Sequence, residues 1–271
     1  MSAPGREDRP LNALAARRRH PAAIAILLFL GLVLVGTAYS LLAPKSAQAS
    51  APSADDVASG RSLFLANCAT CHGLNAQGTP DGPTLVGVGA AAVDFQVGTG
   101  RMPLPGPAVQ AQRQDEIKFS EQEIAALAAY IASLAPGPAI PTEEQLNTEG
   151  ANVALGGEIF RVNCAMCHNF AGAGGALTRG KYAPTLKGVE SRDIYEAMLT
   201  GPQSMPVFND QNISPENKKN VIAFINGIYE RPQQGGMALG NLGPVSEGMF
   251  IWIFGLGIMI GIAVWLGSKA A

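Results

Sequence analysis

Two stretches, Cys68-Ala-Thr-Cys71-His72 and Cys164-Ala-Met-Cys167-His168, decide how this chain is built. They use all 4 cysteines and two of the 3 histidines of the 271-residue sequence. Two thiols three positions apart on one helical turn can each form a thioether bond with a porphyrin edge, and the adjacent histidine then reaches the iron. The motifs therefore predict two covalently bound haem c groups, attached through the four cysteines and each ligated by its histidine.

Other chemistry is known for a Cys-x-x-Cys pair. A redox dithiol would need a βαβ context, which the sequence does not provide. A zinc site would need further Cys or His ligands, and His20 alone is spare. Both alternatives are disfavoured by the repetition of the complete five-residue motif.

The second axial ligand of each iron has to come from elsewhere in the chain. Residues 50–236 contain four methionines: Met102, Met166, Met198 and Met205. Met102 and Met205 both precede proline, and they follow the motif histidines by 30 and 37 residues. Met166 lies inside a cysteine pair, and Met198 fits the packing face of a helix. Met102 and Met205 are thus the predicted ligands, and a soft thioether opposite histidine raises the haem potential.

The surroundings of the two motifs are repeated as well. The block from Gly60 to Cys68 recurs at an offset of 96, the Pro83-Thr84-Leu85 block at 101, and the block beginning at Ser120 at 94. Recurrence of several blocks in one order predicts two copies of one unit. We call them module 1 (55–136) and module 2 (152–231), joined by a proline-rich linker (137–151).

Each module is predicted to be helical. Ser120 with Glu123 three residues later has the pattern of a capping box, and Ser214 before Pro215 marks a second helix start. The carbonyls of Pro83 and Pro184 are expected to accept a hydrogen bond from the free nitrogen of each axial histidine. Arg101 and Tyr182 are interpreted as surface groups, with contact to a haem propionate as the alternative.

Both ends of the sequence carry long uncharged runs, residues 22–43 and 248–268. At about 1.5 Å per residue either run can cross a bilayer core of about 30 Å. We predict membrane helices at 21–43 and 248–268. A signal peptide cleaved after Ala49 is the alternative for the first run, and a buried core helix for the second. Because Arg17–Arg19 and Lys269 flank the runs, both ends, including the tail 1–20, are expected in the cytoplasm, with the haem modules on the outer face.

Composition narrows the function classes. The net charge of −2 argues against a nucleic-acid partner. No histidine is left in the modules for acid–base catalysis, and six-coordinate irons are closed to substrate, so the modules should pass electrons without bond chemistry of their own. The predicted fold class is all-α, with two tandem cytochrome c domains between two transmembrane helices.

Beyond the haem motifs, the phrases F-Q-V-G-T-G-R-M-P, M-L-T-G-P-Q-S-M-P and E-G-M-F-I-W-I complete a family pattern. From about residue 55 to its end the chain resembles the dihaem cytochrome c subunit of the cytochrome bcc complex, the quinol–cytochrome c reductase of high-GC Gram-positive respiratory chains. The resemblance implies class I-like cytochrome c domains, a cytochrome b subunit and a Rieske iron–sulfur subunit as partners, and menaquinol as donor. It also implies electron delivery to a haem–copper terminal oxidase and membership of a translocase.

Two other functions remain open at this point. The chain could be the electron-transfer subunit of another machine, such as a periplasmic dehydrogenase or an oxidase with a fused cytochrome. It could also be a dihaem peroxidase, which requires one iron with a displaceable ligand. Redox partners and the spin state of each iron distinguish these alternatives.

Overall fold

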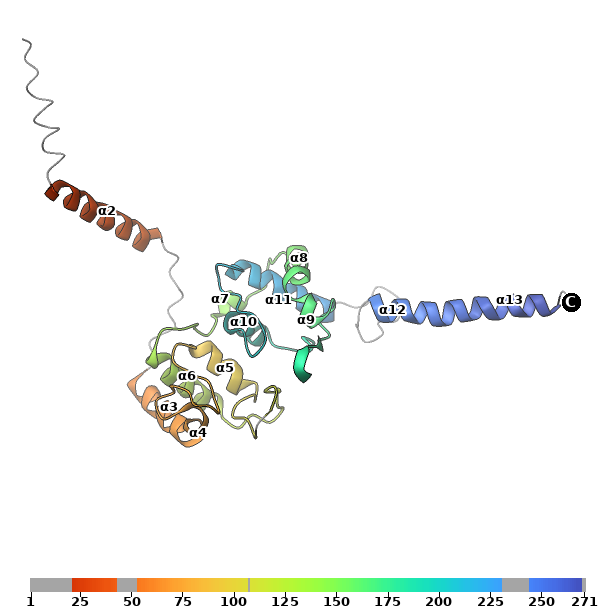
Figure 1. The fold of residues 1–271 in the computed structure, drawn as a ribbon, viewed down its shortest axis with the longest axis horizontal. Coiled ribbons are helices and arrows are strands. Elements are labelled where there is room, and N and C mark those ends of the chain that lie inside the picture. Colours follow the sequence, from red (N-terminus) through yellow and green to blue (C-terminus); the bar gives the residue numbers. More distant parts are fainter. Residues whose placement is uncertain (1–20, 43–52, 107, 231–243, 270–271) are drawn as a thin grey trace, which may run out of the picture. The chain divides into compact units, whose positions relative to one another are not determined.

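The computed structural model describes residues 21–42, 53–106, 108–230 and 244–269 (Figure 1). The predicted tail 1–20 and the cleavage site after Ala49 lie outside these ranges. The chain separates into two compact units, Met1–Gln48 and Ala49–Ala271. In the first unit, helix α2 spans Pro21–Leu42, and its stretch Ala22–Leu41 is long and apolar enough to cross a membrane.

Module 1 is built from four helices. They are α3 (Ala54–Asn67), α4 (Ala69–His72), α5 (Ala90–Gly98) and α6 (Glu121–Leu134). The capping box predicted at Ser120 is confirmed, because its side chain accepts from the Glu123 amide while the Glu123 carboxylate accepts from the Ser120 amide. These reciprocal bonds fix the start of the helix that closes the module.

Module 2 has the same helix order. It comprises α8 (Val153–Asn163), α9 (Ala165–His168), α10 (Ser191–Thr200) and α11 (Pro215–Glu230). Ser214 accepts from the Asn217 amide at 3.3 Å, as expected for a cap. Between α9 and α10 lies a small antiparallel hairpin that was not predicted, made of β1 (Gly175–Ala176), the 3₁₀ turn η1 (Thr178–Gly180) and β2 (Tyr182–Ala183).

The first and last helices of each module cross at a glycine. A Cβ atom on Gly60 would lie 1.9 Å from the Ala126 carbonyl oxygen, and one on Gly156 would lie 1.9 Å from the Asn220 carbonyl oxygen. Such close backbone approach is open only to glycine. One turn beyond each crossing an aromatic pair packs with ring centroids 5.4 Å apart, namely Phe64 with Tyr130 and Phe160 with Phe224. The predicted duplication therefore extends to the packing of the core.

The segment between the modules is packed rather than loose. Gly137 lies so close to Gly89 that a Cβ on Gly137 would be 2.5 Å from the Gly89 nitrogen. The short helix α7 (Glu143–Leu146) follows, and the Gln145 side chain donates to the Tyr195 hydroxyl at 3.1 Å. The segment is thus held at both ends, by module 1 and by module 2.

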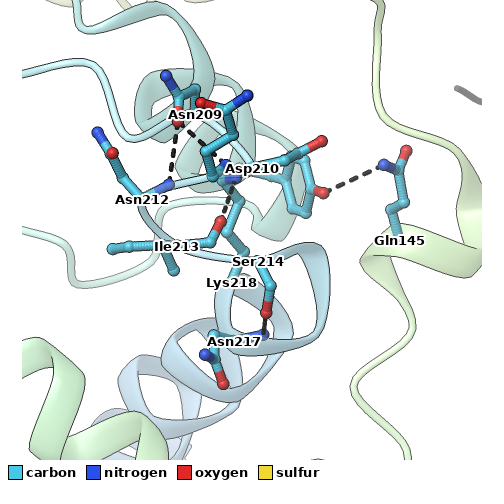
Figure 2. A network of polar contacts seen from close by, with 10 residues as sticks. Gln145, Asn209, Asp210, Asn212, Ile213, Ser214, Asn217 and Lys218 are labelled. Atoms are coloured by element: carbon cyan, nitrogen blue, oxygen red, sulfur yellow. Dashed lines mark hydrogen bonds and ion pairs between the residues drawn. The ribbon is translucent and has the colours of Figure 1, made fainter. Parts of the chain in front are cut away.

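A buried lysine organises the loop that leads into α11 (Figure 2). Lys218 is 0% exposed, and its Nζ donates to Asp210 Oδ1 and to the Ile213 carbonyl, both at 2.7 Å. The same ammonium lies 5.6 Å from the ring centroid of Tyr195. Burying a charge is costly unless it is paired and hydrogen-bonded. Here the Asp210 carboxylate pairs with the ammonium and the Ile213 carbonyl accepts a hydrogen bond from it.

Replacing Lys218 with methionine should lower the free energy of unfolding by about 1–3 kcal/mol, because the buried Ile213 carbonyl loses its donor while the exposed Asp210 can rehydrate. Denaturant unfolding of the detergent-solubilised chain measures this change. Lys219→Met is the matched control, since Lys219 forms a surface pair with Glu216 at 3.6 Å that is worth about 0–1 kcal/mol. Equal losses in the two variants would contradict the role of the buried network.

The C-terminal part of the second unit is one continuous helix. It comprises α12 (Pro244–Phe250), the π-helical stretch η3 (Ile251–Leu256) and α13 (Gly257–Lys269). Residues Ser246–Lys269 form the second candidate membrane span, none of which is buried against the rest of the chain. The predicted fold class is confirmed: a mostly helical chain with two cytochrome c domains and a candidate membrane helix near each end.

Candidate haem sites

Each motif histidine is oriented by a proline carbonyl. His72 Nδ1 lies 2.7 Å from the Pro83 carbonyl oxygen, and His168 Nδ1 lies 2.9 Å from the Pro184 carbonyl oxygen. A carbonyl can only accept, so Nδ1 carries the proton and donates it, which leaves the Nε2 lone pair free for a metal. The contacts expected for Pro83 and Pro184 are therefore confirmed.

The loops that follow the two motifs make equivalent hydrogen bonds. Gly78 N donates to the His72 carbonyl and Gly174 N to the His168 carbonyl, both at 2.8 Å. Two further glycines press on the motifs: a Cβ on Gly82 would lie 2.7 Å from the Cys71 oxygen, and one on Gly175 would lie 2.8 Å from the Cys167 oxygen. The glycine-rich loops therefore bring the proline carbonyls within reach of the imidazoles.

Burial changes the acidity of two motif thiols and of His168. Burial, followed by the influence of Cys167, raises the pKa of Cys164 to about 11, and burial also raises the pKa of Cys68. Thiols with a raised pKa form little thiolate at neutral pH, whereas the reactive thiol of a redox dithiol is largely thiolate. Burial lowers the pKa of His168, partly offset by the Pro184 hydrogen bond, so this imidazole is neutral at pH 7 as an iron ligand must be.

A cavity of about 570 Å³ opens in front of the second motif. Its volume lies within the range of about 300–1,000 Å³ usual for cofactor sites. Cys164, Cys167, His168 and Met205 all line it. The structure thus brings the predicted ligands of module 2 to one cavity whose donor set fits a haem c.

The remaining methionines take different positions. Met102 is half-buried and packs on the core of module 1. Met198 is 2% exposed in the core of module 2, as expected, although it also borders the cavity. Met166 is 88% exposed and also contributes to the lining of the cavity.

The two modules are joined by reciprocal glutamine bonds. Gln110 Nε2 donates to the Tyr182 carbonyl at 2.8 Å while Tyr182 N donates to Gln110 Oε1 at 2.9 Å. Gln203 Nε2 donates to the Ala111 carbonyl at 2.7 Å, and Ala111 N returns a bond to Gln203 Oε1 at 3.0 Å. Each amide side chain thereby satisfies a backbone donor and acceptor of the other module.

The segments that form this interface are those in which the two copies differ in length. Pro184 follows its motif histidine by 16 residues, against 11 for Pro83, and the five extra residues build the hairpin that carries Tyr182. In module 1, the segment 103–119 is nine residues longer than its counterpart and carries Gln110 and Ala111. The sequence analysis did not predict this interface. The feature that could have indicated it is the change in offset between the repeated blocks.

A buried acid lies beside these contacts and was also missed. Glu196 on α10 is 0% exposed and faces Asp94 on α5, which pairs with Arg192 at 3.5 Å. Burial, followed by the charge and hydrogen bonding of Asp94, raises the pKa of Glu196 to about 10; Arg192 opposes the shift and Asp193 adds to it. Glu196 is therefore neutral at pH 7, and no sequence pattern distinguishes it from a surface glutamate.

Replacing Glu196 with glutamine should remove a pH-dependent loss of stability. The unfolded chain ionises this carboxyl above its ordinary pKa of 4.5, whereas the folded chain keeps it protonated, so stability is full below that pKa and falls as the pH rises toward about 10. Unfolding measured at pH 5 and pH 8 should show a gap between variant and wild type that widens by at most about 1.4 kcal/mol per pH unit. The exposed Glu158→Gln serves as control, and a gap independent of pH would show that Glu196 is ionised in the folded chain.

Comparison with known proteins gives a separate family match for each module. The family model "Cytochrome c" matches residues 57–135, and the model "Cytochrome C oxidase, cbb3-type, subunit III" matches residues 151–225. Cytochrome c-554(547) of Halothiobacillus neapolitanus is 36% identical over 90 residues, which are 30% of this chain and 99% of that protein. One stretch of this chain thus corresponds to an entire small cytochrome.

Several relatives match nearly the whole chain. The cytochrome bc1 complex cytochrome c subunit of Corynebacterium efficiens is 43% identical over 269 residues, covering 93% of this chain and 90% of that one. The subunit of the same name from Mycobacterium tuberculosis is 44% identical over 253 residues, covering 90% of each chain. With two cytochrome c domains and identity of this extent, the chain belongs to the family of cytochrome c subunits of the cytochrome bc1 complex.

Proposed function

We propose that this chain carries electrons from the Rieske iron–sulfur centre of a menaquinol-oxidising complex to a haem–copper terminal oxidase. Its partners are then a cytochrome b subunit, a Rieske subunit and the oxidase, within a quinol–cytochrome c reductase that acts as a translocase. The observation that carries the proposal is the pair of Cys-x-x-Cys-His motifs, each with its imidazole oriented by a prolyl carbonyl, in a chain of this family.

The residues proposed for the two sites act by binding and orientation. Cys68 and Cys71 attach one haem c, and Cys164 and Cys167 attach the other. Each bound haem supplies a one-electron iron couple. His72 and His168 would ligate the irons through Nε2, because Nδ1 of each is held by a carbonyl, and the thioethers of Met102 and Met205 would be the second ligands. Most of the surface lining the cavity in module 2 is apolar, and a less polar surrounding of the haem favours a high potential.

We further propose that the modules, with domain limits 55–136 and 152–231 and linker 137–151, lie on the outer face of the cell membrane while both termini are cytoplasmic. The arginines before the first span and Lys269 after the second support this orientation. A phosphatase that is active only after export should be active when fused after residue 230 and inactive when fused after residue 271. Activity at both positions would contradict a second crossing.

The partners are tested by purification of the native complex. Membranes are solubilised gently, the chain is captured through a C-terminal tag, and the associated subunits are identified, with a haem stain on the gel and quinol-driven oxygen uptake as the functional readout. Recovery of a cytochrome b, a Rieske protein and oxidase subunits supports the proposal. Recovery of a flavin or quinoprotein dehydrogenase in their place would retain the electron carrier and overturn the assigned complex.

A further inference from the structure

The cavity in front of the second motif is not closed by module 2 alone. Its lining includes a set of residues from module 1, contributed by α5 and by the long segment that follows it: Phe95, Arg101, Gln110, Arg113 and Asp115. Gln110 is also one of the glutamines that bond the modules together. Module 1 therefore forms part of the wall of the cofactor site of module 2.

Arg101 is the least satisfied member of that wall. It is half-buried, not the surface group expected from sequence, and its guanidinium carbon lies 4.6 Å from the ring centroid of Phe95. Its Nη1 is buried and has no hydrogen-bond partner among the described residues. Burying a guanidinium donor without a partner costs free energy. An anion bound in the cavity would supply the missing acceptor.

The charges around the cavity point to the same conclusion. Four cationic side chains line it against two carboxylates, the cations being Arg101, Arg113, Lys181 and Lys187 and the acids Asp115 and Asp193. Arg113 is 46% exposed and pairs with Asp193 at 3.5 Å. The lining therefore has two positive charges in excess, and a haem brings two propionate carboxylates.

We infer that Arg101 and Arg113 of module 1 bind the propionates of the haem attached to module 2. The inference rests on the proposed attachment of that haem at Cys164 and Cys167. Arginine suits the task because its planar fork of donors matches a carboxylate with two parallel bonds. The contact also places Arg101, the covalent neighbour of the proposed ligand Met102, at the second cofactor, so one backbone step links the two sites.

The test requires a redox potential assigned to one haem of the full-length holoprotein. Cys167→Ala provides the label, because a haem with a single thioether bond keeps a conjugated vinyl group and absorbs at longer wavelength. In this background the two haems are titrated separately by spectroelectrochemistry. If the haem content is unchanged and no band shifts to the red, Cys167 carries no thioether bond, and the proposed attachment fails independently of the inference.

Loss of the arginines should lower the potential of the labelled haem, because removing positive charge beside the propionates favours the ferric form. Arg101→Gln with Arg113→Gln should change its ratio of oxidised to reduced form about tenfold at fixed potential, about 59 mV for a one-electron couple. Arg113→Gln alone tests the contribution of module 1 to the potential without changing Arg101, the covalent neighbour of Met102. Arg61→Gln, an exposed change on α3, is the control.

The two outcomes are separable. A shift of the labelled haem in Arg113→Gln and in the double variant, larger than that of the control and of the unlabelled haem, supports the inference. A labelled haem that stays within the range of the control overturns it, including the case in which only the unlabelled haem moves because Arg101 serves its own module.

Discussion

Replacing Gly156 with alanine should strongly destabilise module 2 and leave the stability of module 1 nearly unchanged. The new Cβ would lie 1.9 Å from the Asn220 carbonyl oxygen, and backbone atoms of a helix cannot yield to it as a flexible side chain would. Helices α8 and α11 must separate, which also breaks the packing of Phe160 on Phe224. We expect a loss of about 3 kcal/mol or more, at the upper end of the costs of overpacking.

The duplication provides a symmetrical experiment. Gly60→Ala should do to module 1 what Gly156→Ala does to module 2, because its Cβ would lie 1.9 Å from the Ala126 oxygen. Gly98→Ala is the control, since no atom lies within 4 Å of a Cβ there and its helix tolerates alanine. Limited proteolysis with mass spectrometry identifies which module has opened. Intact modules in both crossing variants would show that the helices can separate without loss of the fold.

Replacing Met205 with alanine should open the iron of module 2 to external ligands. Met205 lines the cavity together with His168, whereas Met198 is buried in the core and Met166 lies between the two cysteines of the motif. The potential of that haem should fall, since a thioether opposite histidine stabilises the ferrous form. Carbon monoxide binding by one of two haems, measured by difference absorbance, provides the readout.

Two neighbouring methionines serve as controls. Met166→Leu changes a side chain that is 88% exposed, and Met198→Leu changes one that is 2% exposed in the core. Both should leave carbon monoxide binding at the background of the unaltered chain. Met102→Ala should reproduce the Met205→Ala result in module 1. Carbon monoxide binding by Met198→Leu but not by Met205→Ala would reassign the ligand.

Local features of this molecule were predictable because each depends on residues close in sequence. The cap at Ser120, the helix start before Pro215 and the carbonyl contacts of Pro83 and Pro184 all follow from short patterns. The repeat added the order of the helices. What these patterns report is the conformation of one segment or one module.

The relation between modules was not predictable in the same way. Gln110 and Tyr182 are 72 residues apart and lie in segments without periodicity. Glu196 stands among polar and apolar neighbours that would suit an exposed helix face, and its burial depends on α5 of the other module. Only the unequal spacing of the repeated blocks hinted that extra chain had been added where the copies meet.

The glutamine bonds between the modules also bear on kinetics. Two redox sites held in place by these bonds from side chain to backbone would exchange electrons as a first-order process, without a diffusive search by one module for the other. We therefore expect the step between the modules to be insensitive to solvent viscosity and to protein dilution. If overall electron transfer does depend on viscosity or on dilution, the dependence then arises in the steps where this protein meets its electron donor or its electron acceptor.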